Sequence, residues 1–122
     1  MPIRLPIATV NEWLGECSDS QTFVCIDGQR AKSVKDMVKL LEKISLKSYN
    51  HHVTEQKNDF AAWAEGVFHN GHLAANFTSA RSLKETYQYC KRHLKMLQRN
   101  LRDHQMKKER RKTSTTPSLQ VA

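Results

Sequence analysis

The sequence predicts an α+β fold that is mostly helical, with one small β-hairpin packed on several short helices and a long amphipathic C-terminal helix after them. Asp27-Gly28 follows an apolar run, and this dipeptide is a strong signal for a two-residue hairpin turn. Elsewhere in the first 80 residues, apolar side chains recur at helical spacing in short segments separated by turn residues. From residue 82 onward the helical spacing continues without interruption, which predicts one long helix.

The first expected element is a short helix in the segment TVNEWLGE, residues 9–16. Thr9 and Glu12 have the spacing of a capping box. Val10, Trp13 and Leu14 share one helical face, so Trp13 is expected in the core.

The hairpin comes next, where the β-branched and aromatic run from Phe23 to Ile26 ends at Asp27-Gly28. The return segment, QRAK, is polar and predicts a weak edge strand. A two-stranded ribbon is not stable alone in water, so this hairpin must pack on helices.

A helix is expected after Ser33, because Ser33 and Asp36 have the pattern of a helix start. Its apolar face is made by Val34, Met37, Val38, Leu41 and Ile44. Its other side carries Lys35, Lys39 and Lys43, which are interpreted as a solvated face. The following segment fits another short helix with Leu46, Tyr49 and Val53 turned inward.

Asn58 is a good N-cap, and Asp59 suits the positive end of the helix that would begin there. The buried stripe of this helix is expected to be Phe60, Trp63, Ala64 and Val67. Asn70-Gly71 interrupts the pattern, and a further short helix should turn Leu73 and Phe77 inward.

The longest helix should begin at Ser82, which forms a second capping box with Glu85. Its apolar residues alternate steps of four and three, and we call this row the seam: Leu83, Tyr87, Cys90, Leu94, Leu97, Leu101 and His104. The seam needs a partner helix, from this domain or from a second copy. The expected protein interface is Leu83, Tyr87, Leu94, Leu97 and Leu101. The predicted organisation is a compact domain at 1–80, a basic helix at 81–112 and a disordered Ser/Thr/Pro tail at 113–122.

The excess of positive over negative charge lies entirely in the last third of the chain. Residues 1–80 carry 8 Lys/Arg and 9 Asp/Glu, whereas residues 81–122 carry 12 Lys/Arg and 3 Asp/Glu, within a net charge of +8. This imbalance predicts an acidic partner, with nucleic acid favoured, although a basic arm can also simply increase solubility. The expected contact residues are Lys91, Arg92, Lys95, Arg99, Arg102, Lys107, Lys108, Arg110, Arg111 and Lys112.

The binding expected of this arm is electrostatic and non-specific. No zinc-finger spacing or aromatic ribonucleoprotein motif is present, and the basic block follows the heptads instead of preceding them as in bZIP proteins. No apolar run is long enough to cross a membrane, and the N-terminus does not resemble a signal peptide, so a cytoplasmic location is the default expectation.

A metal or catalytic site is the less favoured interpretation. His51, His52, His69 and His72 could supply imidazoles, but adjacent helical residues point about 100° apart and Asn70-Gly71 separates the second pair. The 3 cysteines lack metal-binding spacing, and Cys25 and Cys90 lie in apolar patterns. No phosphate-binding glycine loop or nucleophile motif is present. We therefore expect no metal, no cofactor and no enzymatic activity.

The segment HVTEQKNDFAAWAEGVF, followed by LA and preceded by the hairpin, resembles a small prokaryotic domain family of unknown function. The pattern of that family is approximately H-V-x-x-x-K-N-D-F-x-x-W-I-x-x-V-x-G-D-x-x-L-A. The resemblance covers about residues 22–80 and implies a scaffold, without an activity to transfer. The expected structural signature is His52, Asn58, Asp59, Phe60 and Trp63, with His52 bracing the helix start by hydrogen bonding. Ala64 and His69-Asn70 depart from the pattern, and His51, His69 and His72 lie outside it.

Three hypotheses follow from the sequence. The leading one is a non-enzymatic binding or adaptor protein whose basic helix contacts nucleic acid. The alternatives are an assembly factor, possible as a homodimer, that uses the seam as a coiled coil, and a histidine-based metal-binding protein.

Overall fold

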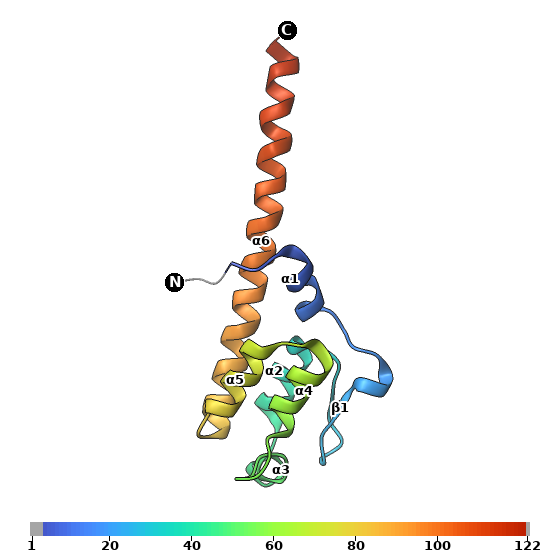
Figure 1. The fold of residues 1–122 in the computed structure, drawn as a ribbon, viewed down its shortest axis with the longest axis vertical. Coiled ribbons are helices and arrows are strands. Elements are labelled where there is room, and N and C mark those ends of the chain that lie inside the picture. The colour runs from blue at the N-terminus through green and yellow to red at the C-terminus, as the bar shows by residue number, and fades with distance from the viewer. Residues whose placement is uncertain (1–3, 122) are drawn as a thin grey trace.

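The fold is a helical body from which one long helix extends, as seen in the computed structural model (Figure 1). The structure describes residues 4–121, and side chains as far as Lys107. The elements in chain order are α1 (Ile7–Leu14), a 3-10 turn η1 (Asp19–Gln21), β1 (Phe23–Val24), β2 (Arg30–Ala31), α2 (Val34–Lys43), α3 (Leu46–His52), α4 (Asp59–Phe68), α5 (Gly71–Ser79) and α6 (Leu83–Val121). The predicted mostly helical α+β fold with one hairpin and a long C-terminal helix is confirmed.

The hairpin forms where it was predicted, but three residues, Ile26, Asp27 and Gly28, make its turn instead of the predicted two, because Cys25 donates its N–H to the carbonyl of Gln29. β1 and β2 are antiparallel, with Phe23 opposite Ala31 and Val24 opposite Arg30. Gly28 has a φ of 94°, a conformation that glycine adopts without a steric penalty. Phe23 and Ala31 face the core, whereas Val24 is 56% exposed, so one face of the ribbon packs on the helices as expected.

Side-chain caps start four consecutive helices. Ser33, Ser45, Asn58 and Asn70 each accept a hydrogen bond from the backbone N–H three residues later. These bonds satisfy N–H groups that have no partner within the first turn of a helix. Ser82 receives the same bond from the N–H of Glu85 at the start of α6.

Two local expectations are wrong. α1 begins at Ile7 after Pro6 and has no side-chain cap, so Thr9 lies inside the helix and forms no capping box with Glu12. Proline is tolerated at the start of a helix because an N–H at this position would have no acceptor within the helix. Leu46 is 61% exposed because it is the first residue of α3, and only the later residues Tyr49 and His52 of this helix are buried.

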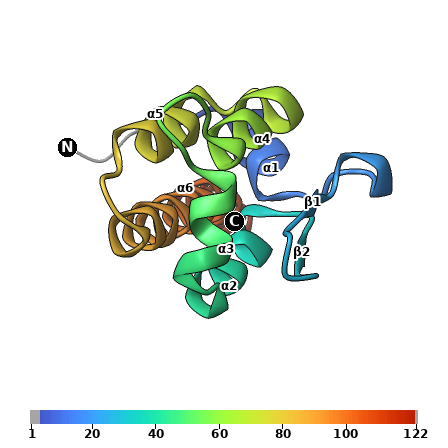
Figure 2. The same ribbon diagram turned by 90° about the horizontal axis from the view of Figure 1, so that it is seen from below.

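The first part of α6 belongs to the same core as the shorter helices. α6 packs against α1, α2 and α5, which lie around it when the fold is viewed from below (Figure 2). Cys90 and Leu97 are fully buried in the same cluster as Phe60 and Phe77. The shorter helices and α6 thus share one core across residues 80 and 81. The predicted disordered tail, residues 113–122, lies outside the residues whose side chains the structure describes.

Candidate nucleic-acid interface

A row of buried polar residues fixes the orientation of α6 on the body. Thr86, His93 and Asn100 recur every seven residues and are 0%, 4% and 6% exposed. A seven-residue step returns to nearly the same side of a helix, so all three point into the body. We call these residues the polar row; buried polar groups of this kind specify helix register because only one register satisfies them.

Each member of the polar row bonds to a different part of the body. The hydroxyls of Thr86 and Tyr49 are 2.6 Å apart, which links α6 to α3. Asn100 Oδ1 accepts the N–H of Leu5 at 3.0 Å. One turn later, His104 Nε2 donates to the carbonyl of Leu5 at 2.7 Å. The N-terminal segment is thereby tied to α6 near the point where the helix leaves the body.

His93 is held as a neutral imidazole. Asn70 Oδ1 accepts the N–H of Leu73, so the amide of Asn70 donates to His93 Nε2 at 2.9 Å. An Nε2 that accepts a hydrogen bond cannot carry a proton. Burial, together with the charge of His72, lowers the pKa of His93 to about 4.

We expect this buried imidazole to make stability depend on pH. Because the ordinary pKa of 6.5 applies in the unfolded chain, that state binds more protons than the folded state between about pH 6.5 and pH 4. The free energy of unfolding should thus fall by about 2 kcal/mol between pH 7 and pH 5. Urea unfolding of wild type and His93→Gln measures this. Gln offers Asn70 an acceptor but does not titrate, so an equal loss in the two proteins would refute the role of His93.

Opposite the buried side, α6 presents a continuous cationic surface. We call it the outer face, and it consists of Lys84, Lys91, Arg92, Lys95, Arg99 and Arg102, all of which are exposed. At 100° per residue these positions fall within about one third of the helix circumference. At 1.5 Å per residue they extend over about 27 Å. Five of the six were predicted contact residues, and Lys84 is the additional member.

The outer-face cations have no carboxylate partners among the side chains that the structure describes. In the part of the chain whose side chains are described, the ion pairs are Lys32–Asp19 and Lys57–Asp59, and neither involves α6. Instead, Lys91 lies 5.7 Å from the ring centre of Tyr87, and Arg92 lies 5.4 Å from that of Tyr89. A cation held against an aromatic ring keeps its charge available for an anion.

Beyond the outer face, the described charges are mixed. Lys107 is exposed and lies near Arg4 and Asp103 around a groove where the N-terminal segment crosses α6. The remaining predicted contact residues are Lys108, Arg110, Arg111 and Lys112, whose side chains lie outside the described residues.

The seam has its partner within the chain. Cys90 and Leu97 are fully buried, and Leu83, Tyr87 and Leu94 are half-buried against the core of the same protein. Leu101 is also half-buried. The predicted interface residues Leu83, Tyr87, Leu94 and Leu97 therefore pack, wholly or in part, against the core of their own chain.

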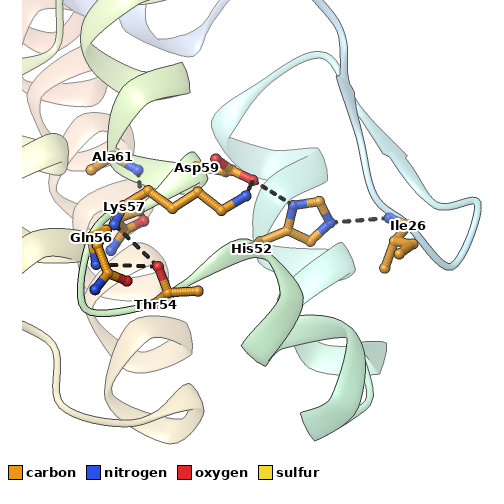
Figure 3. Close-up of polar contacts among 8 residues, drawn as sticks. Ile26, His52, Thr54, Gln56, Lys57, Asp59 and Ala61 are labelled. Carbon is orange, nitrogen blue, oxygen red and sulfur yellow. Dashed lines mark hydrogen bonds and ion pairs between the residues drawn. The ribbon is translucent and has the colours of Figure 1, made fainter.

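The predicted structural signature forms a hydrogen-bonded junction between α3, α4 and the hairpin (Figure 3). His52 Nε2 accepts the N–H of Ile26 at 3.0 Å, so Nδ1 carries the proton and donates to Asp59 Oδ2 at 2.9 Å. Burial opposes ionisation of Asp59, but the hydrogen bonds from His52 and Lys57 outweigh it and hold the pKa of Asp59 below its ordinary value. Phe60 and Trp63 lie in the core beside this junction.

Asn58 joins α4 to α5 and gives a direct test of the junction. Its Oδ1 accepts the N–H of Ala61 at 3.0 Å, and its Nδ2 donates to the carbonyl of Phe77 at 3.1 Å. Asn58→Ala should lower the free energy of unfolding by about 2 kcal/mol because both bonds are lost. Asn58→Ser keeps a capping oxygen and should lose about half as much. Equal losses in a urea titration would show that the cap contributes nothing.

The histidines first considered for a metal site lie in separate environments. His52 is buried in the junction, while His51, His69 and His72 are exposed. His69 ends α4 with a φ of 53°, and His72 lies in the first turn of α5 beside the edge of Trp13. Among the described residues, no three His, Cys, Asp or Glu side chains are grouped so that they could hold a metal ion.

Burial raises the pKa of all three cysteine thiols, which are Cys17, Cys25 and Cys90. A nucleophilic cysteine needs the opposite shift, since the thiolate is the reactive form. These environments match small packing residues.

Comparisons with known proteins provide no relative from which a function could be assigned. No protein-family model matches the chain, and neither a curated protein nor a solved structure matches it. In the part of the chain that the structure describes, no helix has the length and apolar character needed to span a membrane.

Proposed function

We propose that this is a non-enzymatic binding protein whose basic C-terminal helix contacts nucleic acid through the phosphate backbone. The observation that carries the proposal is the outer face of α6: six exposed cations on one side of a helix, without carboxylate partners among the described residues. The opposite side of the helix is occupied by the core. The cations are thus held in a fixed arrangement that faces away from the body.

The dimensions of the outer face suit a nucleic-acid duplex. Double-stranded DNA carries one negative charge per roughly 1.7 Å of its axis, so a surface of about 27 Å faces many phosphates. Six contacts would release about five condensed counterions, which supplies most of the binding free energy at low salt. Phosphate contacts carry no direct base information, and the proposed binding is therefore independent of sequence.

The position of the seam favours this function over the assembly alternative. An interface made by Leu94 and Leu97 would require these side chains to leave a core in which Leu97 is fully buried. The exposed side of the same helix is cationic and would repel the same side of a second copy. Binding of an acidic partner to the outer face neither removes Leu97 from the core nor brings like charges together.

Fluorescence anisotropy with labelled 30-base-pair duplexes tests the proposal. At about 50 mM salt we expect duplexes of unrelated sequence to bind with the same affinity, and heparin to compete. Truncation after Gln105 removes the terminal basic block and should weaken binding by about tenfold or more, with the outer face retaining the rest. Absence of binding by the full chain at this salt concentration would end the proposal.

A further inference from the structure

A second cationic surface lies on the body, in a groove between β2 and α2. The groove has a volume of about 200 Å³ and is lined by Gln29, Arg30, Asp36, Lys39, Leu40 and Lys43. Its cations come from two elements, with Arg30 on the hairpin and the two lysines on the facing helix. The sequence alone indicated only a solvated helix face, because the position of the hairpin opposite these lysines depends on the tertiary fold.

The charges that line this groove are unbalanced. Asp36 is its single acid, and Asp36 Oδ2 already accepts the N–H of Lys32 at 3.1 Å. Within the described side chains, Arg30, Lys39 and Lys43 form no ion pair. Like charges four residues apart on a helix repel each other slightly, so the proximity of Lys39 to Lys43 does not stabilise α2. Glu42 is exposed on the same helix but does not line the groove.

The helix dipole explains only part of this arrangement. Lys43 lies in the last turn of α2, where a cation is favourable. This effect does not reach Arg30, which belongs to the opposite wall.

We propose that the groove between β2 and α2 binds a phosphate-type oxyanion. The guanidinium of Arg30 can donate two parallel hydrogen bonds to such a group, and the two lysines supply point charges from the other wall. The phosphate can belong to a nucleic-acid backbone or to a small phosphorylated molecule. The proposal does not rest on the function of α6, because the groove is built from other elements.

NMR titration of the full chain with inorganic phosphate, at ionic strength held constant with chloride, tests the site. Saturable shifts are expected at the backbone amides of residues 29–31 and 39–43. The variant Lys39→Gln/Lys43→Gln should weaken the fitted affinity by about tenfold, as for the loss of charge-assisted hydrogen bonds. The matched control Lys35→Gln/Lys47→Gln removes two exposed lysines that do not line the groove and should leave it unchanged.

A second titration with a 30-base-pair duplex identifies the source of the phosphate. If the groove variant also weakens duplex binding by about fivefold or more relative to the control, the ligand is the nucleic-acid backbone. If only inorganic phosphate is affected, the ligand is a small phosphorylated molecule. Non-saturable shifts with both probes, or equal losses in the groove and control variants, would overturn the site. Because inorganic phosphate is tested without nucleic acid, this result is separate from the test of α6.

Discussion

Replacing Lys91, Lys95, Arg99 and Arg102 with glutamine should reduce affinity for duplex DNA by about 10³-fold at roughly 0.1 M salt. Each lost phosphate contact removes close to one released counterion, and four such losses act together. Glutamine has nearly the same helix propensity as lysine and arginine, and all four positions are exposed, so the fold should be unchanged. Fluorescence anisotropy gives the affinity, and circular dichroism checks the fold.

A pair of matched double variants separates the outer face from net charge. Lys95→Gln/Arg99→Gln removes two cations from α6 and should weaken binding by about 50-fold. Lys35→Gln/Lys47→Gln removes the same charge from α2 and α3 and should change affinity less than about threefold. Equal effects of the two pairs would show that only the total charge matters, and would contradict a defined contact surface.

The second large effect concerns the seam, where Leu97→Asp should unfold the protein. Leu97 is fully buried, and an aspartate there would place a carboxylate in an apolar core without a partner. The penalty is several kcal/mol, comparable with the total stability of a small domain of about 5–15 kcal/mol. Loss of the cooperative thermal transition, followed by circular dichroism, measures this outcome.

Gln98→Asp is the matched control for this substitution, because the neighbouring position is exposed. It introduces the same charge on α6 and should change the free energy of unfolding by about 0.5 kcal/mol or less. A Leu97→Asp protein that still unfolds cooperatively, but has a smaller mass by light scattering than wild type, would contradict the packing of the seam within the chain. That result would support seam-mediated assembly instead.

Local signals in the sequence predicted most of the elements. Ser33 and Asn58 cap the helices they were expected to cap, and Gly28 turns the hairpin, because each interaction spans only a few residues. The expected cap at Thr9 did not form because Pro6, the residue immediately before α1, occupies the N-cap position and the helix starts at Ile7. Leu46 was expected to be buried because periodicity identifies the apolar face of a helix. Periodicity does not show whether another element covers the end of that face.

The contacts of the polar row and the groove between β2 and α2 could not be predicted from the sequence. The spacing of Thr86, His93 and Asn100 is visible as a polar heptad beside the seam, but their partners lie 37, 23 and 95 residues away. Such contacts depend on the tertiary fold. The cations of α6 were predicted from composition and helical spacing, whereas the structure was needed to show that the outer face forms no ion pair with any described carboxylate.

The salt dependence of duplex binding tests the central claim most directly. For wild type, the logarithm of the binding constant should fall linearly with the logarithm of salt concentration, with a slope of about −5 or steeper. The slope of the variant that lacks Lys91, Lys95, Arg99 and Arg102 should be shallower by about 3 to 4. Identical slopes for the two proteins, or an affinity that does not change with salt, would contradict binding through the outer face of α6.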